Sequence, residues 1–280
     1  MRTWQLRRDT WEIPPAGGIM GILNVTPDSF SDGGLYSAPE AALAHARHMA
    51  KAGAHIIDIG GESTRPGARE VSVQEELSRT LPIITALRAA HPRLLLSIDT
   101  RHAAVARAAL DAGADIVNDI TALADPAMRE LCAERPCGIV LMHMQGTPAT
   151  MQLNPQYTDV VAEVRAFFEQ RLRLAEQAGI APTRICLDPG IGFGKTVQHN
   201  LALIAHTEQL RVHNRPILMA LSRKRFLSAL LSDTPQPGAA PLPTVAMSLL
   251  AAERGADLHR VHDVAELQQA LTLRHALCRL

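Results

Sequence analysis

Polar side chains that could bind a ligand follow short apolar runs at intervals along the chain. Runs such as 19–23, 55–59 and 94–98 are rich in Ile, Leu and Val, as parallel strands buried on both faces are. Each run ends in a residue that carries charge or forms hydrogen bonds. These residues are Asn24, Asp58, Asp99, Asn118, Asp119, His143, Asp188, Ser222, Lys224, Arg260 and His262. Their shared position predicts one polar pocket at the carboxyl ends of the strands.

The residue types in this pocket indicate what it binds. Carboxylates and amides accept hydrogen bonds from a ligand rich in N–H groups, and one carboxylate can meet two neighbouring ring donors. Arg65, Lys224, Arg260 and His262 offer positive charge to an anion such as a phosphate. No Ser-His-Asp order or Cys-His pairing indicates a covalent nucleophile. The pattern therefore favours a site that positions its ligands and stabilises charge.

Two glycine-containing segments, 24–34 and 60–67, follow the first two predicted strands. Loops of this length at the mouth of a barrel often act as lids, so we expect both to close over a ligand. Phe30 and Phe193 lie in mouth loops, where they form either a wall for a flat ligand or a local hydrophobic anchor.

The segment 190–196, GIGFGKT, resembles a phosphate-binding P-loop only at its end. Pro189 stands where that motif needs its first glycine, and the glycines alternate rather than follow GxGxxG. The segment also follows a late strand, so we reject an ATPase function.

The elements that must position these residues alternate between strand and helix. Ala-rich and Leu-rich segments, including 40–52, 73–90 and 157–178, are predicted helices. Gly53, Gly113 and Gly255 each precede an alanine and a strand, as expected for helix C-terminal caps. Eight strands over about 250 residues predict an α/β fold, a (β/α)8 TIM barrel. An open doubly wound sheet is the alternative.

We expect a single barrel domain over residues 19–280, preceded by an extension over 1–18 that forms a hairpin below the barrel. The segment 232–243, SDTPQPGAAPLP, contains four prolines and is predicted to be a loop after the seventh strand.

Composition excludes several classes of function. The chain has 280 residues, 47% of them hydrophobic, with 28 Lys plus Arg balanced by 28 Asp plus Glu. This balance predicts no nucleic-acid partner and no membrane partner. The four cysteines lack metal-site spacing, and no secretory signal or membrane-length apolar run occurs, so we expect a cytoplasmic protein with free thiols.

Two long motifs carry a resemblance to a known family. The segments 21–34, GILNVTPDSFSDGG, and 58–67, DIGGESTRPG, resemble those of dihydropteroate synthases, which are pterin-binding TIM-barrel enzymes. The similarity continues through SIDT at 97–100, VNDI at 117–120, LMHMQG at 141–146, LDPGIGFGK at 187–195, SRK at 222–224 and RVHDV at 260–264.

This resemblance implies that the protein is a transferase of folate biosynthesis and a target of sulfonamides. In the family's reaction, 4-aminobenzoate displaces pyrophosphate from 6-hydroxymethyl-7,8-dihydropterin diphosphate and gives 7,8-dihydropteroate. The resemblance also implies Mg²⁺ as cofactor, these two small molecules as binding partners, and a homodimer.

The resemblance assigns roles residue by residue. It implies catalytic roles for Asp32, Arg65, Asp99 and Lys224. It implies a pterin site of Asp99, Asn118, Met142, Asp188 and Lys224. The diphosphate would be bound by Asn24, Thr64, Arg65, Arg260 and His262, with Asn24 also a Mg²⁺ ligand. The 4-aminobenzoate site would be formed by Phe30, Thr64, Pro66, Phe193 and Ser222.

Three alternative functions stay open on sequence alone. Corrinoid methyltransferases that use methyltetrahydrofolate share the barrel and the pterin-binding residues, but they do not need SRK and RVH for a diphosphate. The other two are a non-catalytic pterin-binding paralogue and a barrel that only binds a partner.

Overall fold

Eight parallel strands form the centre of the molecule in the computed structural model, which describes residues 2–25, 38–62, 70–148, 150–232 and 241–278. Their order is β8-β7-β6-β5-β4-β3-β10-β9, and a parallel bridge between Leu187 and Ile217 joins the two ends. The closed ring confirms the predicted TIM barrel. The strands are β3 (Gly18–Asn24), β4 (Ile56–Gly60), β5 (Leu95–Asp99), β6 (Ile116–Asp119), β7 (Gly138–Met142), β8 (Ile185–Asp188), β9 (Leu218–Met219) and β10 (Leu258–Val261).

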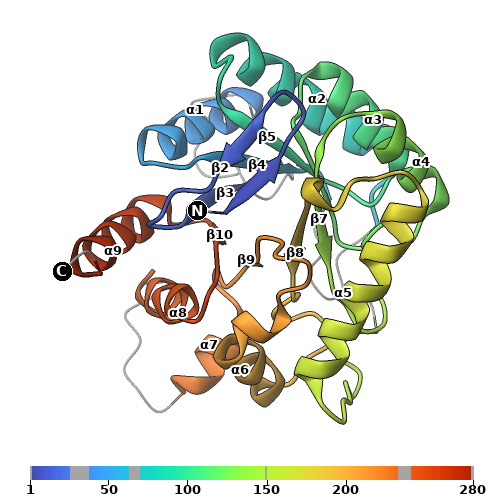
Figure 1. The fold of residues 1–280 in the computed structure, drawn as a ribbon. Helices are drawn as coiled ribbons and strands as arrows, with labels where there is room; N and C mark the ends of the chain where they lie inside the picture. Colours follow the sequence, from blue (N-terminus) through green and yellow to red (C-terminus); the bar gives the residue numbers. More distant parts are fainter. Residues whose placement is uncertain (1, 26–37, 63–69, 149, 233–240, 279–280) are drawn as a thin grey trace.

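Helices surround this ring on its outer side (Figure 1). In the described residues the helices are α1 (Ala38–Lys51), α2 (Val73–Ala90), α3 (Ala103–Ala112), α4 (Pro126–Glu134), α5 (Val160–Gln177), α6 (Val197–Ala205), α7 (Arg225–Leu230), α8 (Leu242–Glu253) and α9 (Val264–Leu277), with short 3-10 turns η2 (Pro182–Arg184) and η3 (Thr207–Leu210). The larger hydrophobic cluster fills the space between helices and strands.

An antiparallel hairpin precedes the barrel, as predicted for residues 1–18. It consists of β1 (Thr3–Gln5) and β2 (Thr10–Glu12), and Figure 1 shows it across the end of the barrel where the chain starts. Trp4, Leu6 and Ile13 pack in one cluster with buried side chains from the beginnings of the strands. The Trp4 indole N–H donates to the backbone oxygen of Arg184 at 2.8 Å. The hairpin therefore closes the amino-terminal end.

The barrel interior changes from apolar to polar along the strands. Alternate strands of such a barrel supply one layer of inward side chains, and side chains two residues apart point to the same face. One such set is Ile56, Ile116, Cys186 and Leu258, all buried in the cluster under the hairpin. Two residues further along the same strands are Asp58, Asn118, Asp188 and Arg260. This arrangement places the polar layer toward the carboxyl ends.

The predicted glycine caps are confirmed at the three helix-to-strand returns. Gly53, Gly113 and Gly255 have φ values of 107°, 113° and 100°. Residues with side chains rarely adopt this left-handed conformation, which lets the chain turn from the helix directly into the next strand.

Several predicted boundaries were wrong, and three of them have a clear consequence for the elements concerned. Helix α5 begins at Val160, not Tyr157, because the Asp159 carboxylate caps it by accepting from the N–H groups of Val161 and Ala162. Pro243 belongs to the first turn of α8, where its missing N–H costs no helix hydrogen bond. Strand β9 has only two residues, although the apolar run 217–221 predicts a longer strand.

No helix in the described residues is long and apolar enough to cross a bilayer. The four cysteines are free, as expected. The cytoplasmic location stays a prediction.

Candidate active site

Arg260 links two carboxylates at the carboxyl end of the barrel. Its Nε donates to Asp58 Oδ2 at 2.6 Å, and its Nη2 donates to Asp99 Oδ2 at 2.5 Å. Burial raises the pKa of Asp99, and the charge of Arg260 offsets part of that effect. The sequence grouped Arg260 with a diphosphate, whereas its guanidinium here lies against Asp99, a predicted pterin ligand. The remaining N–H groups of Arg260 can still serve an anion.

Asn118 lies against Asp58, the first of these two carboxylates. Its Nδ2 donates to Asp58 Oδ2 at 3.0 Å, and both side chains are buried. This bond fixes which end of the Asn118 amide faces Asp58. The amide oxygen cannot take that place, because it would meet a carboxylate oxygen, and both are hydrogen-bond acceptors. Asp58 ended a predicted strand but received no role from the sequence.

Asp188 is a buried carboxylate with one oxygen committed to the backbone. Its Oδ1 accepts from Gly190 N at 2.7 Å. Burial raises its pKa, while this backbone bond and the charge of Lys224 lower it. The Met142 side chain lies beside Gly190, because a Cβ at that glycine would come within 3.3 Å of Met142 Cγ. Asp188 and Met142 thus lie in one corner of the pocket.

Lys224 and Phe193 form a cation–π pair. The Lys224 Nζ lies 4.2 Å from the centroid of the Phe193 ring. Burial lowers the pKa of Lys224 to about 8, and Asp188 is the main charge that opposes this effect. The contact joins a predicted pterin ligand to a predicted wall of the aminobenzoate site.

A buried lysine that received no predicted role holds the Phe193 loop in place. Lys195 Nζ lies 2.9 Å from His143 Nδ1 and donates to Phe193 O at 2.9 Å. Burial lowers the pKa of Lys195 to about 7 and that of His143 to about 3, so the imidazole is neutral and accepts. The Tyr157 hydroxyl donates to Gly194 O at 2.9 Å. The glycine-rich segment is therefore held by side chains rather than folded as a nucleotide loop.

Ser222 and His262 contact each other between the last two strands. The Ser222 hydroxyl lies 2.9 Å from His262 Nδ1 and accepts from the His262 backbone N–H at 3.1 Å. Ser222, a predicted contact of 4-aminobenzoate, thus orients His262, a predicted contact of the diphosphate.

Asp119 does not serve the pocket. Its carboxylate accepts from the Thr121 N–H and hydroxyl and from the Leu123 N–H, at 2.7 to 2.8 Å. The sequence grouped Asp119 with the strand-end residues predicted to bind a ligand. That prediction was wrong, because both carboxylate oxygens stabilise the turn after β6.

Asn24 is the predicted Mg²⁺ ligand at the end of β3. A Cβ at Gly60 would lie 3.8 Å from Asn24 Oδ1 and 3.7 Å from Asp99 Oδ2, so both oxygens lie beside that glycine. Within the described ranges, no three His, Cys, Asp or Glu side chains gather as a metal site. An amide oxygen suits Mg²⁺, which keeps several waters and shares phosphate oxygens with its substrate. The donor set fits an ion that arrives with the diphosphate.

Five predicted site residues lie outside the described residues. They are Phe30, Asp32, Thr64, Arg65 and Pro66, and the two predicted lids fall in the same segments. The roles predicted for these residues therefore stay predictions.

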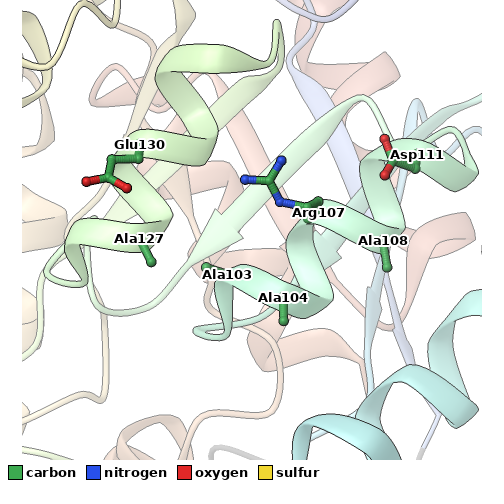
Figure 2. Close-up of a pocket in the computed structure, with 7 residues that line it drawn as sticks. All are labelled: Ala103, Ala104, Arg107, Ala108, Asp111, Ala127 and Glu130. Carbon is green, nitrogen blue, oxygen red and sulfur yellow. The ribbon is translucent and has the colours of Figure 1, made fainter.

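A shallow groove on the outer surface is unrelated to this pocket. Figure 2 shows it between α3 and α4, lined by alanines together with Arg107, Asp111 and Glu130. Arg107 pairs with Glu134, and Asp111 pairs with Arg135. None of the polar strand-end side chains lines it.

Comparison with known proteins decides the family. A model described as "pterin binding enzyme" matches residues 20–262, a range that contains every predicted site residue. The chain belongs to the family of pterin-binding enzymes.

Members of this family with known names are similar over nearly the whole chain. Dihydropteroate synthase of Escherichia coli K12 is 46% identical over 258 residues, which are 92% of this chain and 90% of the relative. A Xanthomonas albilineans dihydropteroate synthase structure with 4-aminobenzoic acid has a TM-score of 0.88, 47% identity and 94% coverage of both chains. A complex of that organism's enzyme with 7,8-dihydropteroate has a TM-score of 0.87, 43% identity and 97% coverage of both chains.

Proposed function

We propose that this chain catalyses the dihydropteroate synthase reaction. It joins 4-aminobenzoate to 6-hydroxymethyl-7,8-dihydropterin diphosphate and releases pyrophosphate. The observation that carries the proposal is the Asp58–Asp99–Arg260 cluster with Asn118 beside it, at the carboxyl ends of the barrel. Relatives of this chain at 46% identity carry the name of that enzyme.

The pterin half of the substrate matches the carboxylate side of the pocket. Its 2-amino group and ring N–H groups are neighbouring donors, which a carboxylate can accept together. Asp188 has one oxygen free of the Gly190 bond, and Asn118 turns its oxygen away from Asp58. Lys224 and Met142 complete this part of the site.

The diphosphate half matches the cationic side. Arg260 contributes charge and hydrogen-bond donors, His262 contributes a ring nitrogen, and Asn24 is the chain's ligand for Mg²⁺. The ion, when bound, neutralises charge on the departing pyrophosphate. The C–O bond to pyrophosphate breaks, and Asp99 stabilises the positive charge that develops on the pterin methylene.

The second substrate needs little activation. The aniline nitrogen of 4-aminobenzoate is nucleophilic as a neutral amine; it forms the new C–N bond and then loses one proton. Phe193 and Ser222 form part of the wall for its ring. Lys195 positions the loop that carries Phe193, and Ser222 is held by His262.

We also propose that the chain forms a homodimer through α8. The exposed positions of this helix include Leu242, Ala246 and Leu250, whereas Thr244 and Ser248 face inward. Val245, Met247 and Leu249 of the same helix pack against the core, so Leu242 and Leu250 are the large apolar side chains that α8 leaves exposed. A partner that covers them would remove apolar surface from water. Helix α9, which lies beside α8 in Figure 1, also exposes two leucines, Leu273 and Leu277.

The reaction is tested by supplying both substrates with Mg²⁺ and detecting 7,8-dihydropteroate by mass spectrometry. We expect product only when both substrates are present. Methyl transfer from methyltetrahydrofolate to a corrinoid, with no dihydropteroate, would favour the methyltransferase alternative. Pterin binding without either reaction would indicate a non-catalytic paralogue.

A further inference from the structure

Asp58 is a fully buried carboxylate to which the predicted reaction gives no task. It lies on β4, with Asn118 two strands away on one side of the ring and Arg260 two strands away on the other. One oxygen, Oδ2, accepts from both residues, at 3.0 Å from Asn118 Nδ2 and 2.6 Å from Arg260 Nε. The other oxygen, Oδ1, is buried without a hydrogen-bond partner among the described residues.

Burial of a charged group at this position needs a reason. A buried carboxylate loses its hydration, and replacing a buried ion pair by apolar side chains is often neutral or stabilising. The same strands carry Ile56, Ile116 and Leu258 one layer below, so an apolar layer could continue upward. Stability alone therefore does not explain a carboxylate here, and its two partners point to the ligand.

The two bonds remove one rotational choice from each partner. Asn118 could otherwise present either its N–H groups or its oxygen to a ligand, and the bond to Asp58 determines which. Arg260 could otherwise rotate its guanidinium plane, but its Nε and one Nη2 are held by Asp58 and Asp99. Planar donors are most effective when their orientation is set before the ligand binds.

We propose that Asp58 is a positioning residue that orients Asn118 for the pterin and Arg260 for the diphosphate through one shared oxygen. This role rests on the proposed function. Asp58 acts on both halves of the substrate without itself contacting the bond that breaks, so its loss weakens binding of each half separately.

Two shape-matched substitutions separate the accepting oxygen from the charge. Asp58→Asn keeps an oxygen that can accept from both partners, whereas Asp58→Leu removes it. Ser97→Ala is the matched control, because Ser97 is fully buried and pairs with Asp58 across β4 and β5, and its hydroxyl has no described partner. Circular dichroism establishes that each variant folds.

Calorimetry with 6-hydroxymethyl-7,8-dihydropterin reports on Asn118, and calorimetry with pyrophosphate and Mg²⁺ reports on Arg260. We expect Asp58→Leu to lower the affinity for each ligand by about tenfold or more, and Asp58→Asn to lower it by about threefold or less. Ser97→Ala should leave both affinities unchanged. Wild-type affinity in folded Asp58→Leu would overturn the proposal. If Asp58→Leu does not fold, a tenfold loss of pterin affinity in Asp58→Asn would overturn it.

A double-mutant cycle distinguishes positioning from general distortion of the barrel. In an Asn118→Ala background, an Asp58 substitution should cost less pterin affinity than it does in the wild-type protein, because the amide that it orients is gone. Additive losses would contradict the proposal and indicate a purely structural role. Failure of the wild-type protein to bind the pterin at all would instead contradict the proposed function, so the two failures are distinct.

Discussion

At the scale of single residues, the pocket works by matching donors and acceptors in a water-poor site. The buried carboxylates and amides have their orientations set by neighbours rather than by the ligand. An unpaired donor or acceptor in such a site costs more free energy than an unpaired one at the surface, where water can replace the missing partner. Single-atom substitutions are therefore informative here.

Asp188→Asn should bind 6-hydroxymethyl-7,8-dihydropterin more weakly. Gly190 N already occupies Oδ1, so an amide that keeps this bond would turn its NH₂ group toward the ring donors of the pterin. The loss is about 1.5–3 kcal/mol for one charge-assisted bond. Calorimetry measures it, with the melting temperature as the control for folding. Unchanged affinity would remove Asp188 from the pterin site.

Buried Lys195 predicts a stability that depends on pH. Its pKa is lowered to about 7 in the folded protein against 10.5 for an exposed lysine, so the unfolded chain binds more protons between these values. Stability should therefore rise with pH from about 7 to about 10.5, by at most about 1.4 kcal/mol per pH unit for this one group.

Lys195→Met should reduce that rise, measured by urea unfolding at several pH values. Lys224, whose pKa is also lowered, keeps part of it. An equal slope in the variant would mean that burial does not lower the pKa of Lys195 in the folded protein.

At the scale of elements, the sequence predicts the strands and their polar ends better than the contacts between them. The apolar runs, the glycine caps and the barrel follow from local composition and a period of two. The role of Asp58 does not, because its partners lie 60 and 202 residues away in the sequence.

Hydrogen bonds to neighbouring residues explain two other features that the sequence did not predict. Asp119 looked like a ligand-binding strand end, yet donors two and four residues later satisfy its carboxylate. Lys195 received no role from the sequence, yet it points inward to His143. The residue types were visible in the sequence, but the direction of each side chain depends on the neighbouring loop.

Gly190→Ala should destabilise the barrel strongly. Gly190 has φ of 65°, and an added Cβ would lie 1.9 Å from His143 O. We expect a loss of roughly 3 kcal/mol or more in the free energy of unfolding.

Gly179→Ala is the matched control. Gly179 has φ of 83° but nothing within 4 Å of the added Cβ, so only backbone strain of about 1–2 kcal/mol applies. Equal losses in the two variants, measured by urea unfolding, would show that the 190–195 loop shifts to accept a side chain.

At the scale of the whole molecule, the barrel separates stability from chemistry. The hairpin and the apolar layer close one end, and the polar layer opens at the other. Helices α8 and α9 each expose two leucines on the outer surface, and this apolar surface predicts a dimer.

Leu250→Glu on α8 should convert a dimer into a monomer, as measured by size-exclusion chromatography with light scattering. Leu153→Glu is the control, because Leu153 is 76% exposed but lies between β7 and α5, away from that helix. A monomeric wild-type protein, or two variants that both stay dimeric, would contradict an interface at α8.

Pyrophosphate release from 6-hydroxymethyl-7,8-dihydropterin diphosphate, with and without 4-aminobenzoate, tests the proposed function most directly. The proposed reaction relies on the amine of the second substrate as its nucleophile. We therefore expect release to depend on 4-aminobenzoate and to equal the dihydropteroate formed. Release at the same rate without 4-aminobenzoate, or no release with both substrates and Mg²⁺ present, would contradict it.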